Sequence, residues 1–552
     1  MKTIIYQALP RLWGNRNEAR VQGGTLQQNG CGKMNDFTPS VLKRLREMGV
    51  THVWYTGLLR HATMTDYSKA GIPQQHPAVV KGQAGSPYAI ADYYDIDPDL
   101  ASKPQKRMEE FDKLVVRTHR AGLKMVIDFV PNHVAREYQS ICKPEGVKDL
   151  GEEDDPNMGF SPRNNFYYCP GQAFTPYFDL YHGQQEPYRE EPAKATGNDH
   201  FDNAPSRNDW YETVKLNYGV DYYAGRIGHF LPVPNTWHKM LHILLFWAGK
   251  GVDAFRCDMA EMVPAEFWQW ATSQVKDQFP HVAFIGEVYN PGEYRRYLAS
   301  GFDWLYDKVG MYDALRALTC GHADVSAVSS AWQQTDDIRS HMLYFLENHD
   351  EQRLASDFFA GEGRKGIPAL AVALLLGDNP FMLYMGQALG ERGMDEEGFS
   401  GRDGRTTIFD YWSIDTLCRE AKGQLSKEEL QLKDSYSRLM AIAQQEPAVA
   451  EGKMFDLCYV NRHQPRVFSF LRKSGRQSLL VVANFSDEAT EAHIIIPQAA
   501  FDYLDLKAGV HQAVDLMRTE AEAEATALDL RPDKAVRVSV GAWSAMVLSL
   551  RS

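Results

Sequence analysis

Cysteine is scarce and scattered in this sequence. Only seven of the 552 residues are cysteine, their number is odd, and no two have the CxxC spacing of common zinc and redox sites. We therefore expect neither a disulfide framework nor a structural zinc site. The same usage is typical of a protein from a reducing compartment and predicts a cytoplasmic location.

Two other features are missing, an excess of basic residues and a long apolar run. The 59 Lys and Arg residues are outnumbered by 72 Asp and Glu residues, which gives a net charge of −13. No basic surface is available to meet nucleic acid or an anionic membrane. The apolar part of residues 1–10 is too short for a signal peptide, and the run 369–376 is too short to span a bilayer. We expect no nucleic-acid or membrane partner, and nothing indicates an oligomeric state.

What the sequence does have is an ordinary globular composition and one recurring pattern. Hydrophobic residues make up 44% of the chain, and its length suits two to four domains. In the pattern, an amphipathic helix ends at a glycine and a short apolar strand follows. Apolar residues at helical spacing over 41–48, for example, precede Gly49 and the run 50–55. Strands that are apolar throughout are buried on both faces, as in a parallel sheet.

Eight strands can be assigned in this way. They are 4–9, 50–55, 125–130, 252–255, 282–285, 304–306, 343–346 and 381–384. Eight strand–helix units over about 400 residues predict a (β/α)8 TIM barrel with insertions. The alternative is a doubly wound α/β sheet, but no GxGxxG motif follows the first strand.

The pattern breaks twice, and the breaks predict the domain boundaries. Residues 134–223 are long, rich in Pro, Gly and Asn, and weakly periodic, which predicts an inserted subdomain after the third strand. Residues 451–552 contain short β-rich runs separated by turn residues, which predict a C-terminal antiparallel β-sandwich. The barrel then comprises residues 1–133 and 224–450. The Glu/Ala-rich run 519–526 predicts a solvated surface segment.

Polar residues stand where four of the predicted barrel strands end. Asp128, Asn132 and His133 follow the third strand, Arg256 and Asp258 the fourth, Glu287 the fifth, and Asn348, His349 and Asp350 the seventh. The carboxyl ends of barrel strands carry the active sites of this fold. Because the four sets converge on one barrel mouth, they predict a catalytic site there.

The residue types in these sets suit the hydrolysis of glycosidic bonds. A retaining glycosidase needs two carboxyl groups about 5–5.5 Å apart. Neighbouring strands lie about 4.8 Å apart, so Asp258 and Glu287 can form such a pair. Arg256 lies two residues before Asp258 and therefore points to the same side, where it can keep that carboxylate ionised. Burial of Glu287 among apolar neighbours would raise its pKa, as a catalytic acid requires.

These residues also carry a family resemblance. The segments 128–133, 251–258, 286–288 and 348–350 resemble, in order, the four short sequence regions of the α-amylase family of glycoside hydrolases. Residues 88–93 resemble the segment whose tyrosine stacks on the sugar at the cleavage point. The resemblance covers the whole chain, and it is strongest to the bacterial branch of α-amylases and maltooligosaccharide hydrolases.

The resemblance implies a role for each matching residue. It makes Asp258 the nucleophile, Glu287 the acid/base and Asp350 the group that stabilises the distorted sugar, with Arg256 orienting the nucleophile, His133 and His349 bonding sugar hydroxyls and Tyr88 stacking beneath the ring. The implied substrate is an α-glucan or maltooligosaccharide cleaved at α-1,4 bonds. The chemistry itself requires no cofactor.

The sequence departs from the family pattern in two places. Many members have a Lys-His pair shortly after the nucleophile that binds the leaving-side glucose, whereas this chain has Met259, Ala260, Glu261 and Met262. The resemblance therefore does not extend to the subsites with which ordinary starch amylases bind the leaving-side glucose. Asn132 stands at a position that often binds calcium in the family. The resemblance therefore allows, but does not require, a structural Ca²⁺ ion at Asn132. The loop 15–36 lacks the acidic calcium loop of some relatives.

Three functions are compatible with the resemblance. The first is hydrolysis of α-glucans by double displacement. The second is transglycosylation by the same residues, with a sugar in place of water as the acceptor. The third, a non-catalytic glucan-binding protein, is disfavoured because all three carboxylates are present.

Overall fold

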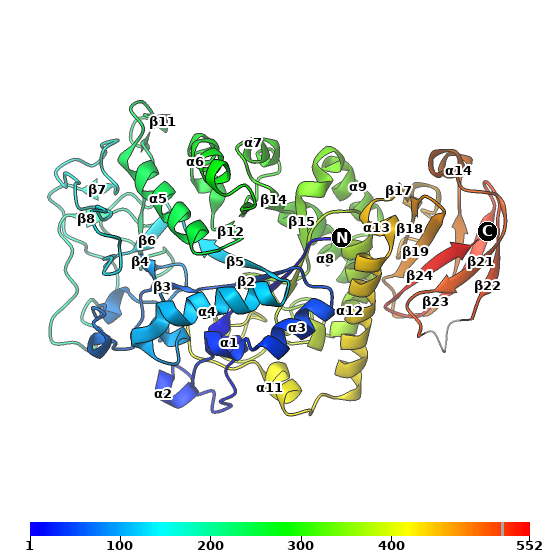
Figure 1. Ribbon diagram of the computed structural model, residues 1–552, viewed down its shortest axis with the longest axis horizontal. Coiled ribbons are helices and arrows are strands. Elements are labelled where there is room, and N and C mark those ends of the chain that lie inside the picture. The colour runs from blue at the N-terminus through cyan, green and yellow to red at the C-terminus, as the bar shows by residue number, and fades with distance from the viewer. Residues whose placement is uncertain (520–523, 552) are drawn as a thin grey trace.

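The computed structural model describes residues 1–519 and 524–551, and its centre is a closed barrel of eight parallel strands (Figure 1). The barrel strands are β1 (Ile4–Ala8), β2 (His52–Tyr55), β5 (Lys124–Phe129), β12 (Ala254–Cys257), β13 (Ala283–Gly286), β14 (Trp304–Tyr306), β15 (Met342–Phe345) and β16 (Phe381–Tyr384). They follow one another around the barrel in chain order, and β16 pairs with β1 to close it. These are the eight predicted strands, so the predicted fold class is confirmed.

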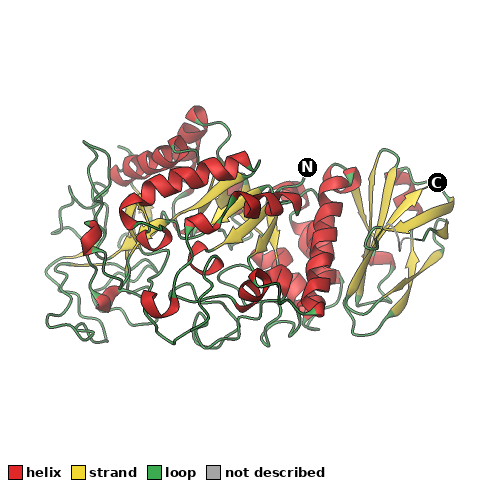
Figure 2. Cartoon of the chain, turned by 60° about the horizontal axis from the view of Figure 1, so that its bottom comes forward, coloured by secondary structure: helices red, strands yellow, loops and turns green. Residues whose placement is uncertain are grey.

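Helices cover the outside of the barrel and connect its strands (Figure 2). The connecting helices are α1 (Pro10–Trp13), α2 (Leu26–Asn29), α3 (Pro39–Glu47), α4 (Arg107–Arg120), α5 (Asn235–Gly249), α6 (Ala265–Gln278), α7 (Tyr294–Ala299), α8 (Asp313–Thr319), α9 (Ser326–Gln334) and α10 (Ile367–Leu375). In α3 the Thr38 side chain accepts a hydrogen bond from the Val41 amide and so caps the helix. Gly49 follows with a φ of 100°, a left-handed conformation that ends the helix and starts the turn into β2.

Alternation along the strands divides the apolar residues between two cores. On β12, Ala254 belongs to the core inside the barrel, together with residues such as Trp54. Phe255 and Cys257 face outward into the core between barrel and helices. Arg256 therefore points inward, toward the barrel mouth, and Cys257 is a buried thiol directed away from it.

The segment between β5 and α5 is irregular and forms one end of the molecule (Figure 1). Its strands are short antiparallel pairs: β6 (His133–Ala135) with β9 (Thr213–Lys215), β7 (Tyr168–Cys169) with β8 (Ala193–Lys194), and β10 (Val220–Asp221) with β11 (Ile227–Gly228). A further pair, β3 (Leu59–His61) and β4 (Ile90–Ile96), follows β2. Because β6 starts at His133, the segment joins directly to the polar residues that follow β5.

After β16, the helices α11 (Asp415–Ala421), α12 (Lys427–Gln445) and α13 (Pro447–Ala450) lead to the opposite end of the molecule (Figure 1). There an antiparallel sheet contains β17 (Lys453–Asp456), β18 (Val467–Ser474), β19 (Gln477–Asn484), β24 (Ser544–Arg551), β21 (Gly509–Asp515) and β22 (Thr526–Leu530), and a second contains β20 (Thr490–Ile495) and β23 (Ala535–Val540). The helix α14 (Gln498–Leu504) lies between β20 and β21.

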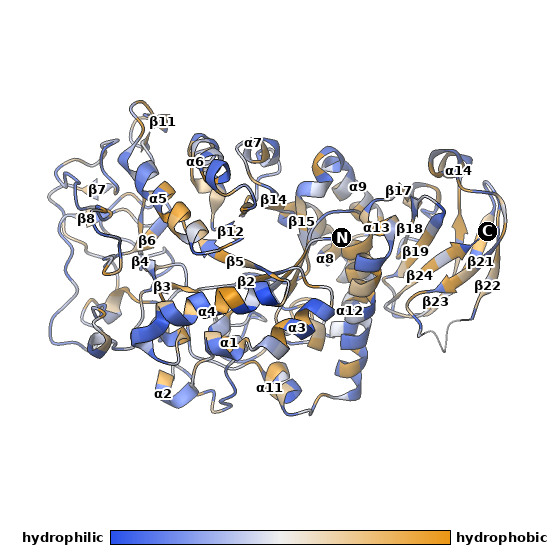
Figure 3. Cartoon of the chain, in the orientation of Figure 1, coloured by the Kyte–Doolittle hydropathy of each residue, from blue (hydrophilic) through white to orange (hydrophobic). Residues whose placement is uncertain are grey.

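The two C-terminal sheets share one apolar core. Leu480 of the first sheet and Ile494 and Val538 of the second belong to the same buried cluster. The hydrophobic colouring of Figure 3 follows the strands that supply it. Of the predicted solvated run 519–526, residues 520–523 lie outside the described residues. No helix within residues 1–519 and 524–551 is long and apolar enough to cross a membrane.

Candidate active site

A cavity of about 220 Å³ opens at the barrel mouth, where the sequence predicts the site. Five of the predicted site residues line it: Tyr88, His133, Asp258, Glu287 and Asp350. Arg256 lies beneath the carboxylates, and His349 lies behind Tyr88, while Asn132 bonds instead to the inserted segment. The structure therefore brings together residues from segments that are far apart in the sequence.

Arg256 connects the two carboxylates that were predicted to carry the chemistry. Its Nη1 atom lies 2.7 Å from Oδ1 of Asp258, and its Nη2 atom lies 2.9 Å from Oε2 of Glu287. Asp258 follows β12 and Glu287 follows β13, and these strands pair in parallel with Cys257 opposite Gly286. The strand register thus sets the two acids side by side. The guanidinium is 0% exposed, which strengthens its attraction for both carboxylates.

Aromatic rings enclose the Arg256 cation. The rings of Trp54, Tyr88 and Tyr306 lie 5.2, 5.4 and 5.5 Å from the guanidinium carbon. Their π faces stabilise a cation, and Tyr306 also accepts a hydrogen bond from Nε. Asp128 lies 3.9 Å from Nη1 and accepts a hydrogen bond from the Gly57 amide, which fits its expected architectural role.

Burial and charge determine the protonation of the two acids. Burial raises the pKa of Asp258, whereas Arg256 and a hydrogen bond from Glu287 lower it. Burial also raises the pKa of Glu287, where Arg256 acts against the rise and the charge of Asp258 adds to it. The expected rise for Glu287 is therefore confirmed, and the effect of Arg256 on Asp258 works against a stronger effect of burial. Two adjacent carboxyls with one cation favour a protonated Glu287 that donates to an ionised Asp258.

Two groups that hold Glu287 were not identified from the sequence. The Tyr289 hydroxyl donates to Oε1 over 2.6 Å, and the backbone amide of Met259 donates to Oε2 over 2.7 Å. Tyr289 lies two residues beyond Glu287, so the same-side argument that found Arg256 could have found it. Met259 points its amide inward because its backbone has a φ of 43°, a left-handed conformation that no sequence pattern announces here.

Tyr88, His349 and Asp350 form a second connected group. The Tyr88 hydroxyl lies 2.7 Å from Nε2 of His349, and their rings stack at 5.2 Å. Gln7 of β1, another residue missed from the sequence, donates from Nε2 to Nδ1 of His349 over 2.8 Å. Nε2 therefore carries the proton and faces Asp350, 3.1 Å away. Burial and then Arg256 lower the pKa of His349 well below its usual value, which keeps the ring neutral.

Burial raises the pKa of Asp350 well above its usual value, and the charge of Glu287 raises it further. This carboxyl therefore titrates together with the other two and not as an isolated group.

His133 lies on the opposite wall of the cavity, beside aromatic residues. Its ring is 5.3 Å from that of Trp210, and burial, followed by the Lys215 charge, lowers its pKa to about 3. The neutral imidazole can exchange hydrogen bonds with hydroxyl groups. Trp210 also lines the cavity, together with Phe399 and Phe409, which the sequence did not single out.

The surroundings of Asn132 do not fit a calcium ion. Its Oδ1 atom accepts a hydrogen bond of 2.6 Å from Nζ of Lys215, and its Nδ2 atom donates to the Gly197 carbonyl. Lys215 is 2% exposed and forms an ion pair of 2.6 Å with Asp199. Calcium takes six to eight oxygen ligands, whereas here an ammonium group already bonds both side-chain oxygens. The expectation of calcium at Asn132 is therefore corrected: a lysine from β9 supplies the cation at this position.

This correction predicts that calcium at Asn132 contributes nothing to stability. Lys215→Met should destabilise the protein by about 1–3 kcal/mol, because it leaves the buried Asn132 oxygen without its donor and the Asp199 carboxylate, which is 26% exposed, without its partner. Urea unfolding followed by tryptophan fluorescence measures the change, with Lys148→Met at an exposed ion pair as a control of little effect. EDTA should leave the wild-type transition unchanged. A wild-type transition that EDTA lowers and Ca²⁺ restores would contradict the assignment.

The sequence of this chain is similar to a known protein family and to several of its members. The family model described as "Alpha amylase, catalytic domain" matches residues 25–438. "Alpha-amylase 3" of Dictyoglomus thermophilum is 25% identical over 66% of this chain and 68% of its own length. "Alpha-amylase MalA" of Haloarcula japonica is 25% identical over 85% of this chain, which spans only 55% of that relative.

A solved structure is similar over the full length. It is that of a noncanonic maltogenic α-amylase from Thermotoga neapolitana, with a TM-score of 0.64 and 20% identity, covering 100% of this chain and 99% of the other. At that identity the likeness establishes a shared fold.

Proposed function

Because the chain belongs to the α-amylase family and is an enzyme that acts on glycosidic bonds, we propose that it hydrolyses α-1,4 bonds of glucans or maltooligosaccharides by double displacement. The observation that carries this proposal is the Arg256 guanidinium, which binds the Asp258 and Glu287 carboxylates at once. An inverting enzyme needs its acids about 6.5–9.5 Å apart to admit a water molecule between them. Two acids that follow neighbouring strands and share one guanidinium support the retaining mechanism instead.

The first step uses the two acids together. An Asp258 oxygen attacks the anomeric carbon while the bond to the leaving oxygen breaks, and Glu287 gives that oxygen its proton. The product is a glycosyl ester on Asp258 together with a released sugar. Asp350 lines the same cavity, and its ionised form would stabilise the oxocarbenium-like transition state.

In the second step, ionised Glu287 takes a proton from water, whose oxygen attacks the anomeric carbon and displaces Asp258. Both steps balance with these side chains and water, so the proposal includes no cofactor. Tyr88 and the neutral His133 line the cavity, where they can contact the ring and its hydroxyls. The seven cysteines, all free thiols in the structure, support a cytoplasmic location as part of the same proposal.

Retention can be observed directly. Two inversions at one carbon should release the α-anomer first, which proton NMR of a maltoheptaose digest detects before mutarotation. First release of the β-anomer would overturn the double-displacement mechanism. The same digest separates the alternatives, because products longer than maltoheptaose would indicate transfer to sugar in place of hydrolysis.

A further inference from the structure

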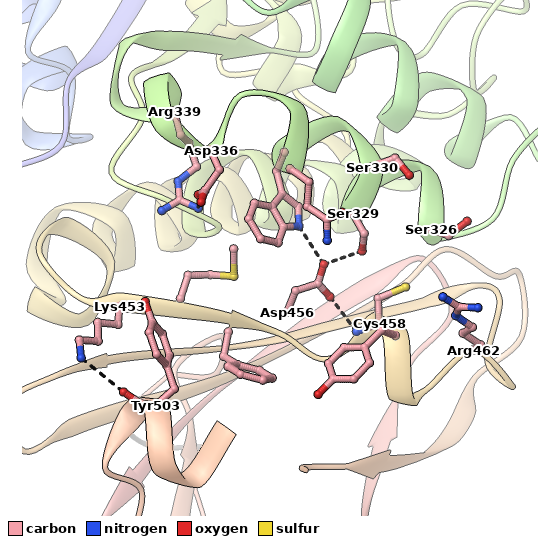
Figure 4. Close-up of a pocket in the computed structure, with 15 residues that line it drawn as sticks. Ser326, Ser329, Ser330, Asp336, Arg339, Lys453, Asp456, Cys458, Arg462 and Tyr503 are labelled. Carbon is pink, nitrogen blue, oxygen red and sulfur yellow. Dashed lines mark hydrogen bonds and ion pairs between the residues drawn. The ribbon is translucent and has the colours of Figure 1, made fainter. Parts of the chain in front are cut away.

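The pocket between the barrel and the C-terminal sheets is crossed by bonds that join these two parts of the fold. Oδ2 of Asp456, on β17, accepts hydrogen bonds from Nε1 of Trp332 over 2.8 Å and from Oγ of Ser329 over 2.5 Å, both on α9 (Figure 4). The Lys453 ammonium lies 4.9 Å from the centre of the Tyr503 ring. This pocket is therefore part of a structural joint. A carboxylate that the proposed reaction leaves without a role lies instead beside the catalytic acid.

That carboxylate is Glu261, in the short segment where the chain departs from the family pattern after the nucleophile. It lies on the single turn of 3-10 helix Ala260–Met262, three residues beyond Asp258. Its Oε2 atom accepts hydrogen bonds from the backbone amides of Tyr289 over 3.2 Å and of Asn290 over 3.1 Å. Both amides belong to the loop that follows β13. One oxygen from the segment after β12 thus binds two successive amides of the neighbouring loop.

The turn that carries Glu261 is itself fixed by buried side chains. The Tyr297 hydroxyl of α7 lies 3.1 Å from the Glu261 carbonyl oxygen and 2.9 Å from that of Val263. Nε1 of Trp268, on α6, donates to the Ala260 carbonyl over 3.1 Å. Tyr297 is 3% and Trp268 0% exposed. Glu261 therefore reaches the loop after β13 from a rigid base, and the loop is held from outside its own segment.

The loop that Glu261 holds carries a hydrogen-bond donor to the catalytic acid. The Tyr289 hydroxyl donates to Oε1 of Glu287 over 2.6 Å, while the Met259 amide donates to the other oxygen over 2.7 Å. Tyr289 and Glu287 line the active-site cavity, whereas Glu261, which the structure also describes, does not. Glu261 therefore has a path to the acid through the Tyr289 backbone and no direct contact with the cavity.

We propose that Glu261 is a positioning residue for the catalytic acid: by binding the amides of Tyr289 and Asn290, it keeps the Tyr289 hydroxyl on Oε1 of Glu287. This inference rests on the proposed function, in which Glu287 is the acid/base. Glu261 does not touch the substrate and acts only through Tyr289. Without it, the two amides bond to water in place of a fixed acceptor, and the tyrosine is no longer confined to its bond with the acid.

The sign of a pH shift separates this role from a simple effect of charge. The Tyr289 hydroxyl lowers the pKa of Glu287, so losing its donation raises that pKa. Removing a nearby negative charge would instead lower it. The charged and titratable groups that face Glu287 belong to other parts of the barrel mouth and stay in place in Glu261 variants; they are Arg256, Asp258, Tyr289, His133, Tyr306 and Asp350.

Glu261→Ala should move the alkaline limb of kcat/KM on maltoheptaose to higher pH by about 0.5–1 unit, because a hydrogen bond to the charged acid is weakened. Glu261→Gln keeps one carbonyl oxygen for both amides without the charge, so its limb should lie at or slightly below the wild-type pH. Glu266→Ala is the matched control, because this acid on α6 is 49% exposed and pairs only with Arg296, at 3.1 Å. It should leave the profile unchanged.

Combining the substitution with Tyr289→Phe tests the path of the effect. If Glu261 acts through the Tyr289 hydroxyl, Glu261→Ala should add no further shift in the Tyr289→Phe background. A shift of equal size in both backgrounds, an unchanged limb or a limb moved to lower pH in Glu261→Ala would each overturn the proposal. Should Glu261→Ala not fold, Glu261→Asp takes its place. It keeps the charge and the acceptor but is one methylene shorter, and it should move the limb in the same upward direction.

Crystal structures of the variants give a measurement that does not depend on turnover. The Tyr289 hydroxyl should leave Oε1 of Glu287 in Glu261→Ala and stay on it in Glu261→Gln. A tyrosine that keeps its place in Glu261→Ala would overturn the positioning role and leave the proposed hydrolysis intact. If the wild type cleaves no α-glucan but Tyr289 is displaced in Glu261→Ala alone, the proposed function fails and the positioning of Tyr289 by Glu261 is supported.

Discussion

Asp258→Asn is expected to lower kcat/KM on maltooligosaccharides by roughly 10⁴-fold or more, because the amide cannot form the glycosyl ester. The variant should nevertheless fold, since the amide oxygen can still accept from Nη1 of Arg256, which lies 2.7 Å from Oδ1 in the wild type. Glu287 and Tyr306 also continue to hold the guanidinium. Kinetics on maltoheptaose, combined with the melting temperature, measure both effects.

The same substitution has an electrostatic consequence at the second acid. The charge of Asp258 raises the pKa of Glu287, so its removal should lower that pKa. Cys257→Ala is a useful neighbour control because this side chain faces the core outside the barrel. It should affect stability more than turnover. If Asp258→Asn turned over substrate as fast as the wild type, Asp258 could not be the nucleophile, and the pair of acids bound by Arg256 would have no role in the reaction.

The barrel could be predicted because its signals are local. Helical spacing over 41–48, a glycine stop at Gly49 and an apolar run after it are all visible within about 15 residues, and the structure has α3 and β2 there. Alternation along the fourth strand likewise predicted that Arg256 points to the same side as Asp258, and the two form an ion pair in the structure. Strand pairing then carried Asp258 and Glu287 to adjacent positions, as the geometry of a parallel barrel requires.

The parts of the site that the sequence did not predict depend on contacts between distant segments. Lys215 bonds Asn132 across 83 residues, from an inserted segment that has no periodic pattern. Gln7 reaches His349 across 342 residues, through closure of the barrel by β1 and β16. A loop position such as Met259 contributes a backbone amide, which every residue has. Local patterns therefore predicted the two acids and Arg256, but not these partners from distant segments and from the backbone.

Glu287→Gln is expected to separate the two halves of the reaction. With maltooligosaccharides, kcat should fall by about 10²–10⁴-fold, because the glutamine has no proton to give the leaving oxygen. Maltosyl fluoride needs no such proton, so its first step should proceed while the second, which lacks a base, becomes slow. We expect a burst of about one fluoride per enzyme followed by slow turnover. Equal losses on both substrates would argue against Glu287 as the acid.

The pH profile supplies an independent test of the same assignment. A catalytic acid works while protonated, so activity should be present below the raised pKa of Glu287 and should be lost as the pH rises through it. The Tyr289 hydroxyl lowers that pKa by donating to the charged form over 2.6 Å. Tyr289→Phe should therefore move the alkaline limb of kcat/KM to higher pH, while Glu287→Gln should remove this limb. A limb that shifts to lower pH in Tyr289→Phe would show that the titrating group is another carboxyl of the cluster, such as Asp350.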